Sequence, residues 1–123
     1  METVSFDLAK KLKEKGFSLD EPYAMYNEQG DLHKLYTSAG YANYYDFDDF
    51  DERDYIAPTI SQILKWLREE KKIYVSVEVE REDWFEYKIV QTIKNTRKSG
   101  RRVYETYSEA ILAGIEYVLD NLI

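Results

Sequence analysis

Hydrophobic residues follow two different spacings along this chain, and each spacing predicts one kind of element. Apolar positions three or four residues apart place one face of a helix against a core, and three segments have this pattern: residues 6–15, 59–71 and 106–123. From residue 73 to residue 80, apolar and polar side chains alternate, as in a strand with one buried face. Residues 84–93 continue this alternation, so the two segments predict a β-hairpin.

Side chains at the predicted helix ends agree with these boundaries. Each helix is preceded by hydroxyl groups able to accept a hydrogen bond from a first-turn amide: Thr3 or Ser5, then Thr59 with Gln62, then Thr106 with Glu109 or Ser108 alone. Gly16 followed by Phe17 predicts a left-handed residue that ends the first helix. Gly114 on the apolar face of the last helix predicts a close approach to a sheet. The first helix carries lysines that we expect to face water: Lys10, Lys11 and Lys13.

A second hairpin is predicted nearer the N-terminus. Residues 23–27 and 32–36 are short strand-like runs, and Gly30 between them suits a turn position with positive φ. Residues 37–57 then lose all periodicity. A connection of this length is rarely without structure, and its many aromatic residues predict that it packs.

The C-terminal half completes a recognisable order of elements. Residues 95–100 predict a turn, and residues 102–105 predict a short third strand after it. The predicted fold class is α+β: helix, β-hairpin, helix, three-stranded antiparallel meander and C-terminal helix. We expect the helices to pack on an antiparallel sheet.

Length and composition restrict the kind of protein this chain can be. A chain of 123 residues fits a single domain, residues 1–123, since one core typically serves roughly 100 to 200 residues. The chain has no cysteine, which removes disulfides, thiolate nucleophiles and zinc–thiolate sites. Neither the apolar region of a signal peptide nor a run of roughly 18 apolar residues occurs. We therefore expect a cytoplasmic protein with no membrane partner.

Three segments carry a resemblance to a known group of proteins. They are APTISQILKWLREEKKIYVSVEV, YSEAILAGIEYVLDNLI and, near the N-terminus, SFDLAKKLKEKGF. Together they resemble small uncharacterised proteins of Bacteroides-type prophages and mobile elements. The resemblance implies an origin in a phage or mobile element and a compact α+β fold, and it transfers no catalytic residue.

Acidic charge is concentrated in one short stretch. The formal net charge is −7, and residues 46–54 alone carry −5 through six carboxylates against Arg53. Aromatic residues interleaved with charges are typical of protein-binding surfaces. The segment from Tyr41 to Tyr55 is therefore a candidate protein-binding site, with these residues: Tyr41, Tyr44, Tyr45, Phe47, Phe50, Tyr55, Asp48, Asp49 and Asp51. The commoner alternative is that the rings turn inward and pin the loop.

Two chemical uses of these carboxylates have little support in the sequence. Calcium takes roughly six to eight oxygen ligands, but Phe50 stands where a calcium loop needs its third ligand, and no glycine follows. A carboxylate pair acting on a sugar needs one buried member with a raised pKa. Closely spaced acids in a polar loop usually stay ionised, so we predict neither a metal site nor a glycosidase pair.

A basic stretch occurs later in the chain. Residues 88–102 contain six lysines and arginines and no acid, and the candidate basic patch within them is Lys94, Arg97, Lys98, Arg101 and Arg102. Such a patch suits phosphates, yet no helix-turn-helix, RNP or KH signature accompanies it, and a solvated turn is the commoner outcome. The two opposite charge clusters also suggest a homo-oligomer, in which the acidic loop of one copy meets the basic turn of another.

No catalytic arrangement is recognisable. His33, on a predicted strand, is the only histidine, no G-x-S-x-G motif occurs, and the five glycines are isolated. We therefore expect no cofactor, and the leading hypothesis is a noncatalytic protein that binds a protein partner through residues 41–55. The alternative is a nucleic-acid-related protein that binds directly through the basic turn or mimics DNA with the acidic loop. An enzyme is the third hypothesis.

Overall fold

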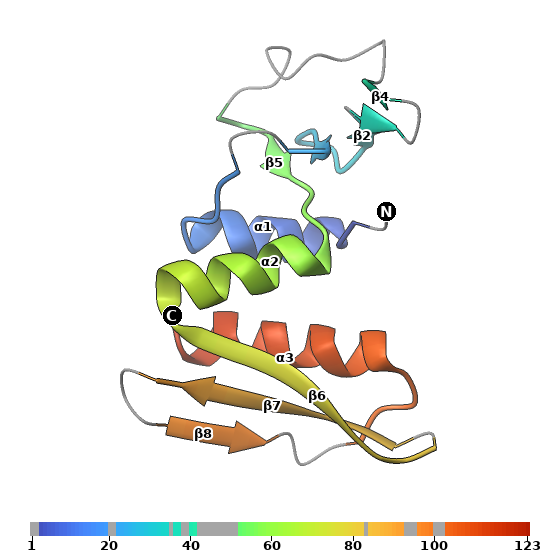
Figure 1. The fold of residues 1–123 in the computed structure, drawn as a ribbon. Coiled ribbons are helices and arrows are strands. Elements are labelled where there is room, and N and C mark those ends of the chain that lie inside the picture. The colour runs from blue at the N-terminus through green and yellow to red at the C-terminus, as the bar shows by residue number, and fades with distance from the viewer. Residues whose placement is uncertain are drawn as a thin grey trace. The chain divides into compact units, whose positions relative to one another are not determined.

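The structure, a computed structural model, describes residues 3–19, 22–34, 36–37, 40–41, 52–82, 84–92, 96–99 and 103–123. The chain divides into two compact units, Met1–Ile60 (unit 1) and Ser61–Ile123 (unit 2). Both contain helical residues and antiparallel strands (Figure 1), which confirms the predicted α+β class. The prediction that the chain forms a single domain stays a prediction.

Unit 1 begins with helix α1, Phe6–Glu14, whose ends are capped as the sequence predicts. Ser5 Oγ accepts a hydrogen bond from the Leu8 amide at 3.3 Å. At the other end Gly16 has a φ of +86°, and the amides of Gly16 and Phe17 donate back to carbonyls of the last turn. These two bonds form a Schellman motif, in which the residue after the left-handed glycine folds back on the helix. The Phe17 side chain is buried as a result.

The predicted N-terminal hairpin is present. β1 (Ala24–Tyr26) pairs antiparallel with β2 (Leu32–Lys34), and Gly30 adopts a φ of +89° before β2. All of β1 is buried, and the Tyr26 hydroxyl donates to the Val4 carbonyl at 2.6 Å. A buried hydroxyl needs such a partner, and this bond also ties the strand to the chain before α1.

Two further ladders lie outside the predicted strands, except that Tyr36 of β3 is the last residue of the predicted strand 32–36. β5 (Tyr55–Ile56) pairs with β1, giving the sheet order β2-β1-β5, while β3 (Tyr36–Thr37) pairs with β4 (Gly40–Tyr41). Strands of two residues are too short to show an alternating pattern. Beside this sheet lies a small core of Ala9, Ala24, Tyr26 and Ala57, with Phe6 and Tyr55 packed against it.

Backbone pairing also joins residues 3–4 of unit 1 to residues 58–59. The Val4 amide donates to the Pro58 carbonyl at 2.9 Å, and Thr3 and Thr59 form an antiparallel bridge. Val4, Pro58 and Thr59 are buried. The residues before α1 therefore lie beside the residues that follow β5.

Helix α2, Ile60–Trp66, begins where the sequence predicts, and a π-helical turn, η2 (Leu67–Lys71), ends it. Lys72 follows with a φ of +57°, in the left-handed region that residues other than glycine rarely adopt. Its ammonium donates to the Glu69 carbonyl at 2.9 Å. The left-handed residue turns the chain out of the helix, although a lysine gives no sequence signal for this conformation.

The three-stranded meander of unit 2 is present, with its third strand earlier than predicted. β6 (Ile73–Arg81) pairs with β7 (Trp84–Gln91), and β7 pairs with β8 (Thr96–Ser99). The prediction of a strand at residues 102–105 is wrong: in the described part of that range, Tyr104 makes an isolated bridge to β7. The sequence misleads because backbone hydrogen bonds hold an edge strand even where its residues are polar, and polar residues also favour turns.

Helix α3, Tyr107–Asn121, lies along β6 and β7 (Figure 1). Thr106 Oγ1 accepts a hydrogen bond from the Glu109 amide at 3.1 Å, which is the predicted cap. A Cβ atom on Gly114 would lie 2.8 Å from Val75 Cγ1, so the predicted close approach of helix and sheet is confirmed. The helix face toward the core is buried: Ala110, Ile111, Gly114, Ile115, Val118 and Leu119.

Candidate functional site

The candidate segment from Tyr41 to Tyr55 has both ends on paired strands of unit 1, since Tyr41 belongs to β4 and Tyr55 to β5. The Tyr55 side chain is half-buried, and its ring lies 5.4 Å from the Phe6 ring at an interplanar angle of 81°. Edge-to-face packing of this kind stabilises an aromatic pair. Tyr55 thus packs inward. For Tyr41 the structure describes the backbone alone. The other candidates lie outside the described residues: Tyr44, Tyr45, Phe47, Asp48, Asp49, Phe50 and Asp51.

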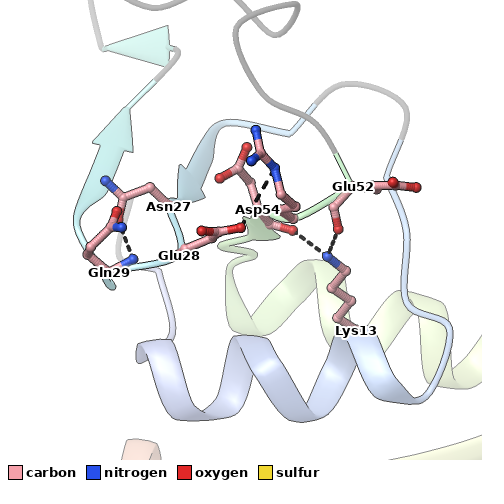
Figure 2. A network of polar contacts seen from close by, with 7 residues as sticks. Lys13, Asn27, Glu28, Gln29, Glu52 and Asp54 are labelled. Carbon is pink, nitrogen blue, oxygen red and sulfur yellow. Dashed lines mark hydrogen bonds and ion pairs between the residues drawn. The ribbon is translucent and has the colours of Figure 1, made fainter.

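Lys13, in the last turn of α1, holds the chain that leads into Tyr55. Its ammonium donates to the backbone carbonyls of Glu52 and Asp54 (Figure 2), the latter at 2.9 Å. It also lies 4.7 Å from the centre of the Tyr55 ring. An ammonium has three donors, and here it also meets the negative face of an aromatic ring. The prediction that Lys13 simply faces water is therefore incomplete. Its carbonyl partners are 39 and 41 residues away, so no local pattern indicates them.

The hairpin turn beside this site is organised by Asn27. Its Oδ1 accepts a hydrogen bond from the Gln29 amide at 3.0 Å (Figure 2) and another from the Asp31 amide at 2.9 Å, an arrangement typical of Asn in turns. In the same turn, the Glu28 carboxylate lies 3.7 Å from Arg53 Nε. This exposed ion pair is worth little energy by itself, but it connects the β1–β2 turn to the turn at residues 52–54.

His33 lies on β2, as the sequence predicts, and is half-buried. Its Nε2 is 3.4 Å from Asn27 Nδ2, and its cross-strand partner is Met25. The imidazole is thus part of the polar network that shapes the hairpin.

A small cavity lies next to the turn at residues 52–54. Its volume is about 190 Å³, and residues from three stretches of unit 1 line it: Ala9, Lys13, Phe17, Met25, Glu52, Asp54 and Ile56. Sites for drug-sized ligands hold roughly 300–1,000 Å³, so this space suits one side chain of a partner better than a cofactor. Glu52 and Asp54 lie within the candidate segment from Tyr41 to Tyr55. The sequence does not indicate the other lining residues, because a wall assembled from three separate stretches leaves no local motif.

The candidate basic patch belongs to unit 2. Arg97 and Lys98 are on β8, and Lys94, Arg101 and Arg102 lie outside the described residues. Lys88, the first cation of the basic stretch, is on β7 with its Nζ 3.7 Å from the Glu78 carboxylate of β6. One positive charge of the stretch is therefore paired across the sheet.

Tyr87, on β7, occupies the core between α3 and the sheet of unit 2. Burial raises the pKa of its hydroxyl above the usual value, and the nearby Tyr104 and Tyr117 raise this pKa further. The ring centres of these neighbours are 6.4 and 6.2 Å away. A raised pKa keeps the phenol neutral, as the core requires, so we assign Tyr87 a structural role.

Among the residues that the structure describes, no three His, Asp or Glu side chains gather as a metal site, and no helix is long and apolar enough to cross a membrane. No family model, curated protein or solved structure matches the chain. Its function must therefore be inferred from its own residues.

Proposed function

We propose that this chain is a noncatalytic cytoplasmic protein of phage or mobile-element origin that binds a protein partner through the segment from Tyr41 to Tyr55. The observation that supports binding is that both ends of this segment are held in place. Both ends belong to paired strands, and Lys13 fastens the turn at residues 52–54 to α1. A segment whose ends are already ordered loses less conformational entropy on binding than a free one.

The cavity adds a pocket for an anchoring side chain of the partner. Phe17, Met25 and Ile56 are apolar residues of its lining, and Lys13, Glu52 and Asp54 are its charged residues. Binding energy at interfaces is concentrated in side chains that fill such pockets, and complementary charge steers the partner toward them. The partner surface that fits best is an apolar side chain flanked by lysine or arginine.

Affinity capture from host lysate with matched charge variants tests this proposal. The segment variant replaces three acids by amides: Asp48→Asn, Asp49→Asn and Asp51→Asn. The control variant removes the same charge at exposed positions elsewhere: Glu69→Gln, Glu70→Gln and Glu82→Gln. We expect the unaltered chain and the control to capture the same protein, and the segment variant to capture about tenfold less of it. Equal capture by both variants contradicts the proposal.

A second candidate function, binding of nucleic acid through the basic patch, is favoured by the position of β8. Its pairing with β7 sets Arg97 and Lys98 in the same ladder as Lys88, where the sequence predicts a turn. Phosphate contacts make affinity fall steeply as salt rises.

Fluorescence anisotropy with labelled duplex DNA and single-stranded RNA tests this alternative. We expect salt-sensitive binding that is lost in the triple variant Arg97→Glu, Arg101→Glu, Arg102→Glu. Absence of binding at low salt, or equal binding by the variant, excludes it.

A further inference from the structure

Strand β6 is at one edge of the sheet β6-β7-β8. The hydrogen bonds of the neighbouring strand β7 identify the β6 residues whose backbone N–H and C=O groups point away from the sheet. Phe85 of β7 exchanges two backbone hydrogen bonds with Tyr104, at 3.0 and 2.9 Å, on the side away from β6. Paired residues in an antiparallel ladder either face each other or both face away. Val79, opposite Phe85, therefore directs its N–H and C=O away from β7, and so do Val77 and Val75 by alternation.

This outer edge has no backbone partner among the residues that the structure describes. A bulge between Val79 and Arg81 ends the regular part of the strand, which leaves the residues Ile73–Val79. Natural sheets protect free edges with charges, prolines or bulges, yet Glu78 is the one charged residue of this stretch. Val79 is 60% exposed and Tyr74 43% exposed.

We infer that β6 pairs antiparallel with β6 of a second copy of this chain, across a two-fold axis. Such a contact is self-complementary, because each copy contributes the same strand. In the register centred on Ser76, Val75 of each copy meets Val77 of the other, and both residues are half-buried with their backbone groups directed outward. The N–H and C=O groups of these two residues then have partners.

The side chains favour a second copy over an unrelated strand. In the same register Glu78 faces Tyr74, so no like charges meet, and like charges directly opposite each other would destabilise the pair. An unrelated strand would have to match this order of residues, whereas a second copy carries it.

The contact is expected to be weak and insensitive to salt. Two strands of this length bury less than the roughly 1,200 Å² typical of stable complexes. Association should therefore appear only at high protein concentration. Backbone hydrogen bonds and apolar contacts are little affected by ionic screening, whereas a contact between an acidic loop and a basic turn is weakened by it.

Sedimentation equilibrium of the full chain at low and high salt measures this association. We expect the average mass to rise with concentration toward twice the monomer mass, equally at both salt levels. Val77→Pro removes an outward N–H in a position where an edge strand tolerates proline, and it should abolish the rise. Val77→Thr keeps the N–H and the branched shape, and it should associate like the unaltered chain.

A second pair of variants covers the case in which the proline disturbs folding. Val79→Lys places a charge at an exposed edge position and should weaken association about tenfold. Ser61→Lys, which adds the same charge at an exposed position on α2, should leave association unchanged. Hydrogen exchange at the Val75 and Val77 amides should slow as concentration rises. A mass that stays monomeric throughout, association retained in both Val77→Pro and Val79→Lys, or association abolished by salt overturns the inference.

Discussion

Unit 1 and unit 2 each bury apolar residues, but they differ in the length of their strands and in the bonds that support those strands. In unit 2, strands of nine and eight residues pair along their length, and the apolar face of α3 lies on them. In unit 1, the described strands are two or three residues long. Bonds from side chains to the backbone reinforce these short ladders, through Ser5, Lys13, Tyr26 and Asn27.

The difference has a physical consequence for local stability. Apolar burial contributes roughly 25 cal/mol per Å² and is spread over many contacts, so unit 2 does not depend on one bond. A hydrogen bond contributes a net of about 1 kcal/mol, and each polar tie in unit 1 has few partners. Binding segments are typically drawn from the less stable parts of a protein, and the candidate segment belongs to unit 1.

Gly114→Val should have the largest effect, because it forces apart the close contact that defines unit 2. A Cβ atom alone would lie 2.8 Å from Val75 and 3.1 Å from Tyr87. Overpacking of this severity should lower the free energy of unfolding by about 3 kcal/mol, measured by urea denaturation followed by circular dichroism. Ala113→Val makes the same branched side chain at the neighbouring, half-buried position and should cost under about 1 kcal/mol. Equal losses would show that the close approach is unimportant.

Lys13→Met should have a smaller effect, confined to unit 1. Methionine keeps an apolar stem of similar length but cannot donate to the Glu52 and Asp54 carbonyls. The free energy of locally opening the β1–β5 pairing should therefore fall by about 1 kcal/mol. That change corresponds to roughly fivefold faster hydrogen exchange at the Ala57 amide, which bonds to β1.

The control for this change is Lys34→Met, which makes the same replacement at an exposed position on β2. It should leave exchange at Ala57 unchanged. Faster exchange throughout both units after Lys13→Met would mean that the bond supports the whole fold, and would contradict the comparison.

Tyr87→Phe should have the smallest effect at neutral pH and a clear effect in alkali. The pKa of Tyr87 is raised in the folded state, so the unfolded chain loses this proton first, near the usual value of about 10. The contribution of the raised Tyr87 pKa to the free energy of unfolding is therefore complete below about pH 10, and it is lost as pH rises toward the folded pKa. Urea denaturation at neutral and alkaline pH should show a shallower alkaline fall for the variant. Tyr107→Phe, at an exposed position, should keep the original pH dependence.

Features with a local cause were predictable from the sequence. Ser5 and Thr106 cap the N-termini of helices, and Gly16 caps a C-terminus, through bonds between residues at most five positions apart. Such spacings are visible in a single chain. The alternation in β6 and the apolar face of α3 are regular and long enough to identify.

Features that depend on distant partners were not predictable. β5 exists because β1 offers it a free edge, and β8 because β7 does, while neither has a strong pattern of its own. The role of Lys13 requires carbonyls that folding brings from the other end of unit 1. The cavity depends on the same assembly, which is why the candidate site was indicated by its charge and aromatic content and not by its geometry.

The bridge between Thr3 and Thr59 has an architectural consequence. With the neighbouring bond from Val4 to Pro58, it brings residues 3–4 next to residues 58–59. The segment of residues 3–59 therefore begins and ends at neighbouring positions. Neighbouring termini are the geometry that makes a folded segment easy to insert into another polypeptide, since closing the junction costs little chain entropy.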